Sequence, residues 1–241
     1  MKKLAAFYQC YKQRKSLNYV LQKFRESYPT EKCFLVCDGG LDYLEESKKY
    51  NCEYKFLDKT ETNKNLTFNS PAACKEYISR FFSSIKELDE DYIIILEDDV
   101  VIFSRINLEK LSAKINGCNK NEFLNKNVES ILMNNGINLP SQKGFYYGAC
   151  GGSILDVQFF KKALKDKSST EKIVNFYCSI SPKDTWASDT ILSFICYAYG
   201  GNIEQYEGYC ETWYPDYKDL ISSGNVKVLH QYKDLYEKNE M

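Results

Sequence analysis

Short apolar runs alternate with amphipathic segments over the first part of this 241-residue chain. The runs with strand character are Leu4 to Cys10, Cys33 to Cys37, Glu53 to Leu57 and Ile93 to Leu96. The segments with helical spacing between them are Ser16 to Tyr28, Leu41 to Tyr50 and the stretch that follows Ser70-Pro71. Regular alternation of strand and helix is typical of a doubly wound sheet. The sequence therefore predicts an α/β fold with one mostly parallel central sheet flanked by helices.

Three acidic residues, Glu97, Asp98 and Asp99, come directly after the apolar run that ends at Leu96. A strand buried on both faces is typical of a parallel sheet, and ligands of such sheets collect at the carboxyl ends of the strands. Mutual repulsion opposes the ionisation of all three carboxyl groups, so the pattern favours a hard divalent cation with oxygen ligands beside them. The alternative is an acidic turn that is merely solvated.

Composition narrows the classes of partner. The chain has 32 basic and 33 acidic residues, a net charge of -1, and therefore no electrostatic footprint for nucleic acid or an anionic membrane. No apolar segment is long enough to predict a membrane span. The 10 cysteines are scattered, and no pair has the spacing of a zinc knuckle or redox motif, which favours reduced thiols and a cytoplasmic location. We expect small molecules or glycans as partners.

We find no internal repeat and no linker, which predicts a single domain over residues 1–241 with a nucleotide-binding half at about 1–103 and an acceptor half at about 104–241. The second half is expected to be mixed in structure. Its predicted elements are an interrupted helix at Leu108 to Leu132, a glycine-broken strand at Phe145 to Leu155, helices at Gln158 to Leu164 and Ser188 to Tyr199, and strands near Ile203 to Tyr206 and Val226 to Leu229.

Four short motifs occur in a fixed order along the chain. They are Phe34 to Gly40, Ile95 to Asp99, Gly148 to Ser153 and Ala187 to Thr190. In this order the chain resembles nucleotide-sugar-dependent glycosyltransferases of the GT-A fold, of the family 2-like, inverting type. The resemblance implies transfer of a sugar from a UDP- or GDP-sugar donor to a glycan or other hydroxyl acceptor.

The resemblance also implies a metal site. Asp99 takes the position of the direct ligand to Mn²⁺ or Mg²⁺, and Glu97 or Asp98 would reach the ribose or a metal-bound water. His230, the single histidine, matches a late-strand metal ligand, and Lys233 would contact the donor phosphates. A purely structural role is the alternative for His230.

The nucleotide pocket is expected at the ends of the first two strands. Asp38 matches a carboxylate that accepts a hydrogen bond from the nucleobase, and Gly39 lets the backbone approach a ligand closely. Tyr8 or Tyr11 would stack on the base. An ordinary strand-end turn is an equally good interpretation of Asp38-Gly39.

Further residues are candidates for the sugar and acceptor surfaces. Gly151 and Gly152 would line the wall beside the transferred sugar, with a glycine-rich bulge as the alternative. Trp186 and Trp213 are candidates for stacking on acceptor sugars, because aromatic faces pack on the apolar sides of pyranose rings. Both tryptophans could equally be core residues.

Asp189 matches the catalytic base of inverting enzymes, which removes the proton from the acceptor hydroxyl. Ser188-Asp189 would also suit a helix N-terminus for its own sake. Such enzymes often carry two acids in tandem here, whereas this chain has Asp189 with Asp184 nearby. Two other functions stay open: a non-catalytic glycan- or nucleotide-binding protein of the same fold and, less favoured because no glycine-rich phosphate loop follows the first strand, a nucleotidyltransferase.

Overall fold

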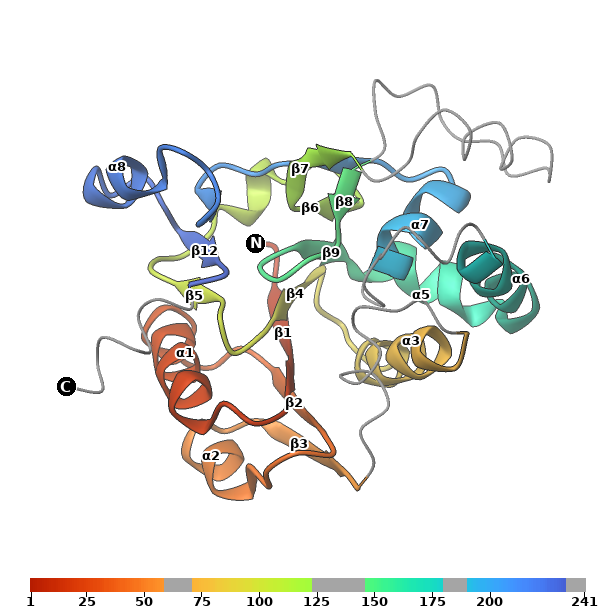
Figure 1. Ribbon diagram of the computed structural model, residues 1–241, viewed down its shortest axis with the longest axis horizontal. Coiled ribbons are helices and arrows are strands. Elements are labelled where there is room, and N and C mark those ends of the chain that lie inside the picture. Colours follow the sequence, from red (N-terminus) through yellow and green to blue (C-terminus); the bar gives the residue numbers. More distant parts are fainter. Residues whose placement is uncertain (59–70, 123–145, 180–189, 233–241) are drawn as a thin grey trace.

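A seven-stranded sheet forms the centre of the molecule in the computed structural model, which describes residues 1–58, 71–122, 146–179 and 190–232 (Figure 1). In spatial order the strands are β10 (Ile203–Glu204), β6 (Ile115–Asn116), β9 (Ile154–Asp156), β4 (Tyr92–Leu96), β1 (Leu4–Cys10), β2 (Cys33–Asp38) and β3 (Glu53–Leu57). Only β9 runs against its neighbours within this sheet. The predicted mostly parallel sheet is confirmed. Strands from both halves of the chain build it.

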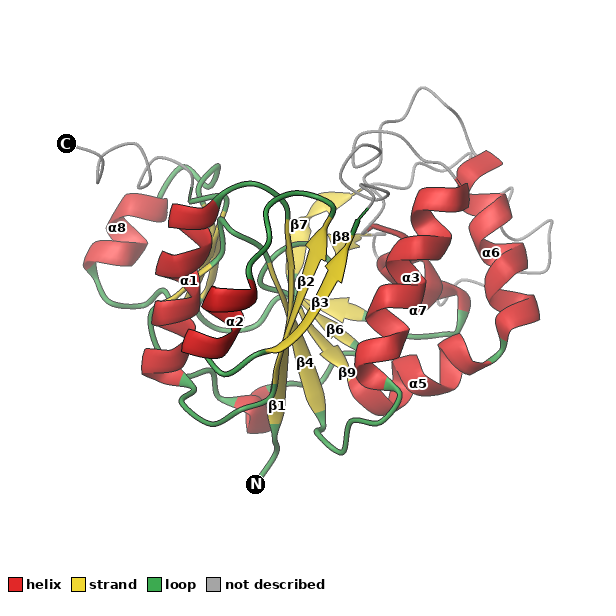
Figure 2. Cartoon of the chain, turned by 90° about the horizontal axis from the view of Figure 1, so that it is seen from below, coloured by secondary structure: helices red, strands yellow, loops and turns green. Residues whose placement is uncertain are grey.

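Helices cover both faces of the sheet (Figure 2). On one side lie α1 (Arg14–Ser27), α2 (Leu44–Lys49) and α8 (Tyr217–Ser222); on the other lie α3 (Pro71–Ile85), α5 (Val157–Lys165), α6 (Lys167–Ser179) and α7 (Thr190–Ala198). In α1 the four apolar side chains Leu17, Val20, Leu21 and Phe24 recur at helical spacing, and all are fully buried. The apolar stripe therefore decides which face of α1 meets the sheet.

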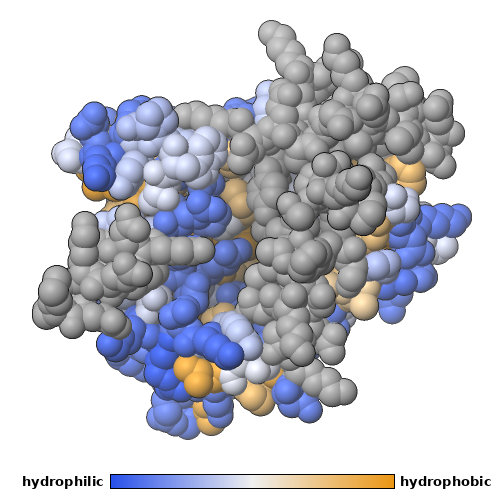
Figure 3. Space-filling view, in the orientation of Figure 1, coloured by the Kyte–Doolittle hydropathy of each residue, from blue (hydrophilic) through white to orange (hydrophobic). Residues whose placement is uncertain are grey.

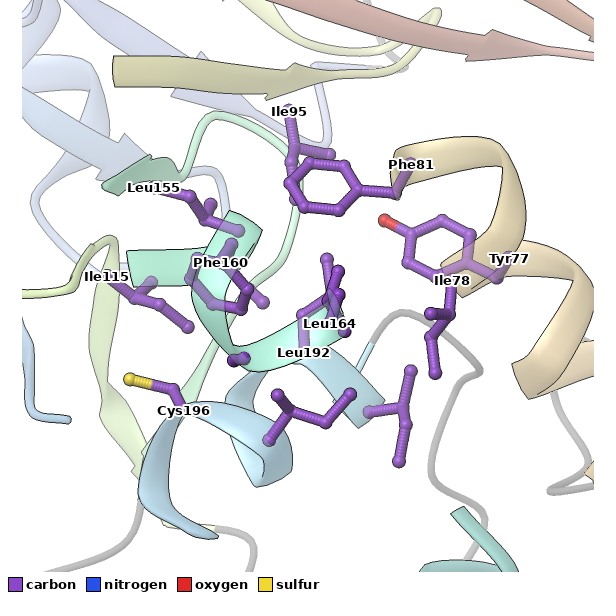
Figure 4. Packing of buried hydrophobic residues seen from close by; sticks show 14 of the residues in the cluster. Tyr77, Ile78, Phe81, Ile95, Ile115, Leu155, Phe160, Leu164, Leu192 and Cys196 are labelled. Carbon is purple, nitrogen blue, oxygen red and sulfur yellow. The ribbon is translucent and has the colours of Figure 1, made fainter. Parts of the chain in front are cut away.

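The core on the α3 side is aromatic and tightly connected (Figure 4). Phe81 of α3 meets Phe7 of β1 with ring centroids 5.7 Å apart and Phe160 of α5 with centroids 5.9 Å apart, both edge to face. Each such ring pair contributes about 0.5–1.5 kcal/mol beyond the area it buries. This core fixes the position of β4, whose five residues Tyr92–Leu96 are all buried.

Two smaller sheets complete the described fold. One consists of β11 (Tyr209–Glu211), β12 (Val228–His230) and β5 (Val101–Ile102), in that spatial order, and the other of β7 (Cys118–Glu122) and β8 (Tyr146–Gly148). Strand β12 runs antiparallel to β5, with Leu229 opposite Val101. The late part of the chain is thereby brought to the point where β4 ends.

The predicted helix at Leu108 to Leu132 is wrong over its described part. The chain forms a 3₁₀ turn, η2 (Leu108–Lys110), followed by β6 and β7. Ile115 is fully buried and pairs with Leu155 of β9, and Gly117 packs so closely on Gly148 and Ser153 that a side chain would overlap them. Sheet pairing thus overrides a helix-like apolar spacing here.

The described surface is mostly polar. Its hydrophilic character dominates the visible described atoms in Figure 3, where apolar patches are small and scattered. Among described residues the large apolar side chains that are exposed are Met1, Leu41, Leu44, Phe56, Phe103 and Trp213. Within the part of the chain that the structure describes, no helix combines the length and apolarity needed to cross a bilayer.

Candidate metal and donor site

Glu97, Asp99 and His230 converge at the carboxyl end of β4. One ligand atom from each of the three lies within 4.8 Å of the others, and His230 Nε2 is 4.0 Å from Asp99 Oδ1. Asp99 and His230 are buried, whereas Glu97 is partly exposed. The structure therefore brings together one acid at the mouth of the cluster with an acid and an imidazole beneath it.

Backbone pairing explains how residues so distant in sequence meet. The chain turns after β4, with Val100 N donating to Glu97 O at 3.3 Å, and then enters β5, which pairs with β12. Tyr232 N donates to Asp99 O at 3.0 Å, just past the end of β12. His230 lies between the residues of β12 that pair with β5 and Tyr232, which binds Asp99. The register of β12 on β5 therefore sets the imidazole beside the acids.

Gly151 lies against this cluster, whereas Gly152 packs on Val228 and Tyr209. Gly152 N donates to Ile95 O at 2.7 Å, which fastens the glycine loop to β4. A Cβ on Gly151 would lie 2.7 Å from His230 Cδ2 and 2.9 Å from its Nε2, and Gly152 has φ +86. Sequence reasoning expects these glycines to make room for a sugar; in the structure the group that approaches Gly151 is the His230 ring.

The other ring nitrogen of His230 faces Glu211 and Cys150. Nδ1 lies 2.9 Å from Glu211 Oε2, and the Cys150 thiol lies 3.6 Å from Glu211 Oε1. Burial lowers the pKa of His230, but hydrogen bonds with Cys150 and Glu211 raise it by more, so the pKa lies well above its usual value. Burial raises the pKa of Cys150 to about 11, which keeps this thiol protonated at neutral pH.

Three carboxyl groups surround the imidazole of His230 in the part of the chain that the structure describes. They belong to Glu97, Asp99 and Glu211, and an ionised carboxylate offers only acceptor oxygens. Carboxylate oxygens with a neutral imidazole form a donor set that suits Mn²⁺, and carboxylates alone suit Mg²⁺. Because Gly151 has no side chain, the His230 ring can pack against it with Nε2 toward Asp99. The residues present therefore fit a divalent cation.

Asp38, the candidate nucleobase acceptor, is fully buried at the end of β2. Its Oδ1 accepts from Arg80 Nη1 of α3 at 2.6 Å, and Arg80 is itself 1% exposed and bound to Glu76 at 2.8 Å. A buried carboxylate requires such a cation, because desolvation alone would be costly. Arg80 thus neutralises the Asp38 carboxylate, and the nucleobase contact expected of Asp38 stays a prediction. Gly39, with φ +67, forms the turn that follows.

The two candidate stacking tyrosines lie in different environments. Tyr8 is fully buried, packs edge to face on Phe24 at 6.0 Å and donates its hydroxyl proton to Val20 O at 3.3 Å, so its ring belongs to the core beneath α1. Tyr11 is partly exposed just beyond β1, and its carbonyl accepts from Leu41 N at 2.9 Å. Tyr11 is thus the more accessible of the two, and its stacking on a base stays a prediction.

The remaining candidates are placed unequally. Asp98 is partly exposed beside Asp99, and Trp213 is 44% exposed just after β11, with its ring 4.6 Å from that of Tyr214. Asp189, Asp184, Trp186 and Lys233 lie outside the described residues. The roles expected of them stay predictions.

Sequence reasoning did not assign Glu211, Cys150 or Arg80 to the site. Glu211 follows two apolar residues in Tyr209–Glu211, and a carboxylate inside an apolar run is a usable signal. Arg80 interrupts the apolar face of α3 in the same way. Their partners, however, depend on which strands and helices meet, which local sequence does not reveal.

Comparison with known proteins finds likeness at the level of structure. No protein-family model matches the sequence, and no curated protein matches it in sequence. The bifunctional glycosyltransferase WbbM superposes with a TM-score of 0.53 at 10% identity over 96% of this chain and 46% of WbbM. The glycosyltransferase GlyE of Streptococcus pneumoniae TIGR4 gives 0.51 at 10% identity over 96% of this chain and 55% of GlyE.

An active-site mutant of LgtC, a galactosyltransferase, gives a TM-score of 0.51 at 12% identity over 93% of this chain and 86% of LgtC. The chain thus spans about half the length of WbbM and GlyE and most of LgtC. At these identities the likeness concerns architecture alone. This protein has the α/β fold of glycosyltransferases such as WbbM, GlyE and LgtC.

Proposed function

We propose that this protein is a metal-dependent glycosyltransferase that moves a sugar from a nucleoside-diphosphate donor to a glycan or other hydroxyl acceptor. The observation that carries the proposal is the convergence of Glu97, Asp99 and His230 at the carboxyl end of β4. That edge of an open α/β sheet is where such folds bind ligands. The likeness to WbbM, GlyE and LgtC supports the same reaction class.

The proposal assigns the metal contacts to three residues. Asp99 and His230 would hold Mn²⁺ or Mg²⁺, with Glu97 at the open side. When bound, the cation supplies Lewis-acid neutralisation of the charge that develops on the departing diphosphate. Partial exposure of Glu97 and Asp98 gives a donor access to the cluster, whereas the buried Asp99 and His230 are shielded from water.

Finer assignments belong to the same proposal. A UDP- or GDP-sugar is the donor, with Tyr11 against the base and Lys233 near the phosphates. Asp189 acts as the base that removes the acceptor proton, so transfer proceeds with inversion at the anomeric carbon. The cytoplasm supplies such donors and keeps the 10 free thiols reduced.

A second candidate function uses the same site without turnover. A binding protein of this fold would still take up nucleoside diphosphate with Mn²⁺, and it would differ from an enzyme only at the acceptor side. The test therefore measures donor binding first and transfer second.

Thermal unfolding with and without Mn²⁺ and each nucleoside diphosphate provides the binding test. A ligand at 100 times its Kd stabilises the folded protein by about 2.7 kcal/mol. For a chain of this size that corresponds to a rise in Tm of about 5–10 °C. Asp99→Asn keeps the shape of the side chain but removes its charge, and we expect it to abolish the rise.

Glu87→Gln is the matched control, because Glu87 is an exposed carboxylate between α3 and the amino end of β4, at the opposite edge of the sheet. This control should keep the full rise in Tm. An unchanged rise in Asp99→Asn would overturn the metal assignment. The protein could instead bind nucleoside diphosphate but release none when it is given nucleotide sugars and acceptors. That outcome would favour the binding protein.

A further inference from the structure

We propose that Glu211 is a positioning residue for the metal site, which holds His230 in the one tautomer and orientation that directs Nε2 at Glu97 and Asp99. The inference rests on the proposed function, because it assigns a partner to a proposed metal ligand. Glu211 itself would touch neither the cation nor the donor.

The two ring nitrogens of His230 face different carboxyl groups. Nδ1 of His230 lies 2.9 Å from Oε2 and 3.1 Å from Oε1 of Glu211, so the carboxylate faces this nitrogen with both oxygens. An ionised carboxylate can only accept hydrogen bonds, and an imidazole that binds a cation through one nitrogen keeps its single N–H on the other. Glu211 therefore keeps the proton on Nδ1. The lone pair is left on Nε2, which is the nitrogen that faces Asp99 at 4.0 Å.

Glu211 is held firmly enough to orient its partner. The residue is 2% exposed, and the Tyr209 hydroxyl donates to Oε1. In the parallel pairing of β11 with β12, Glu211 lies directly opposite His230. Gly151 packs against the opposite edge of the imidazole, at Cδ2. The imidazole is thus confined on two sides, and its free nitrogen points to the third.

The energetics argue for a role beyond stability. A buried carboxylate that pairs with a single imidazole contributes little net stabilisation, since desolvation consumes most of the attraction. An outer carboxylate that orients a metal-binding histidine is by contrast a recurrent arrangement, and loss of such a partner weakens metal affinity about 10–100-fold.

The decisive measurement is direct titration of Mn²⁺ by electron paramagnetic resonance, which counts unbound Mn²⁺ in the presence of a saturating nucleoside diphosphate. Glu211→Leu should weaken Mn²⁺ binding about 10–100-fold. Glu211→Gln should weaken it less, because its amide oxygen still accepts from Nδ1. Glu207→Gln, an exposed carboxylate change in the same segment, should leave the affinity unaltered.

Combination with His230→Ala separates positioning from a general structural effect. If Glu211 acts through the imidazole, the loss seen in Glu211→Leu or Glu211→Gln disappears once His230 is absent. Equal losses with and without His230, or no loss at all, would overturn the inference. Should Glu211→Leu fail to fold, the near-isosteric Glu211→Gln completes the same cycle.

Asp99→Asn distinguishes this inference from the proposed function. If Asp99→Asn and His230→Ala both weaken Mn²⁺ binding and the Glu211 variants do not, the positioning role alone fails. If Asp99→Asn binds Mn²⁺ as tightly as the parent protein, the metal site itself is wrong.

Discussion

Gly151→Ala tests whether the proposed metal site depends on the space at the edge of the His230 ring. The new methyl group would lie 2.7 Å from His230 Cδ2 and 2.6 Å from Val100 Cγ2, where an ordinary contact begins at 3.4 Å. The ring would have to retreat by the difference, about 0.7 Å. Insertion of a methyl into a packed interior costs about 1–3 kcal/mol. Binding constellations lose function when displaced by more than about 0.5 Å.

We therefore expect Gly151→Ala to fold, to lose about 1–3 kcal/mol of unfolding free energy in urea, and to bind Mn²⁺ about 10-fold or more weakly. Gly224→Ala is the matched control. Gly224 has φ +73 and nothing within 4 Å of an added Cβ, so its alanine variant costs about 1–2 kcal/mol through backbone strain alone.

Gly224→Ala should keep the parent affinity for Mn²⁺ despite its lower stability. Parent-like stability and affinity in Gly151→Ala would refute the crowding argument. An equal loss of Mn²⁺ affinity in both variants would show that the loss follows general destabilisation and not the position of the ring.

Two further outcomes follow from the described contacts. Arg80→Met removes the guanidinium from the buried Asp38 carboxylate and should lower the unfolding free energy by about 3–5 kcal/mol in urea titration. The double variant Arg80→Met, Asp38→Asn should regain much of this loss. A loss below about 1 kcal/mol in Arg80→Met would contradict a buried ion pair. Trp213, which is 44% exposed, should cost less than about 1.5 kcal/mol in stability when changed to alanine. Trp213→Ala should nevertheless raise the KM for a glycan acceptor without changing donor affinity. An unchanged acceptor KM would assign Trp213 to packing on Tyr214 alone.

Strands β1, β2 and β4 of the central sheet could be predicted because they are short, mostly buried runs between amphipathic helices. Ile93 to Leu96 is apolar without interruption, and this is the pattern that a strand with helices on both faces requires. The acids that follow could be assigned to the carboxyl edge for the same reason. That Asp99 and His230 meet was expected from the resemblance, and the structure brings them to 4.0 Å.

Other features lay beyond local reasoning because they depend on which distant segments pair. Ile115 belongs to a strand because β9 lies beside it, although its neighbours have helical spacing. Glu211 becomes a partner of His230 only through the register of β11 with β12. Arg80 reaches Asp38 across the interface of a helix and a sheet. None of these partners lies near the other in the sequence.

The small sheet of β11, β12 and β5 has a consequence for the order in which the protein matures. Synthesis delivers the acids of β4 early, whereas the imidazole arrives only after β12 has been made and has paired with β5. A nascent chain that has reached only β4 has the carboxylates without the imidazole. Binding of the cation proposed above would add to the stability of the finished protein, in which this long loop is closed, relative to its partly folded precursors.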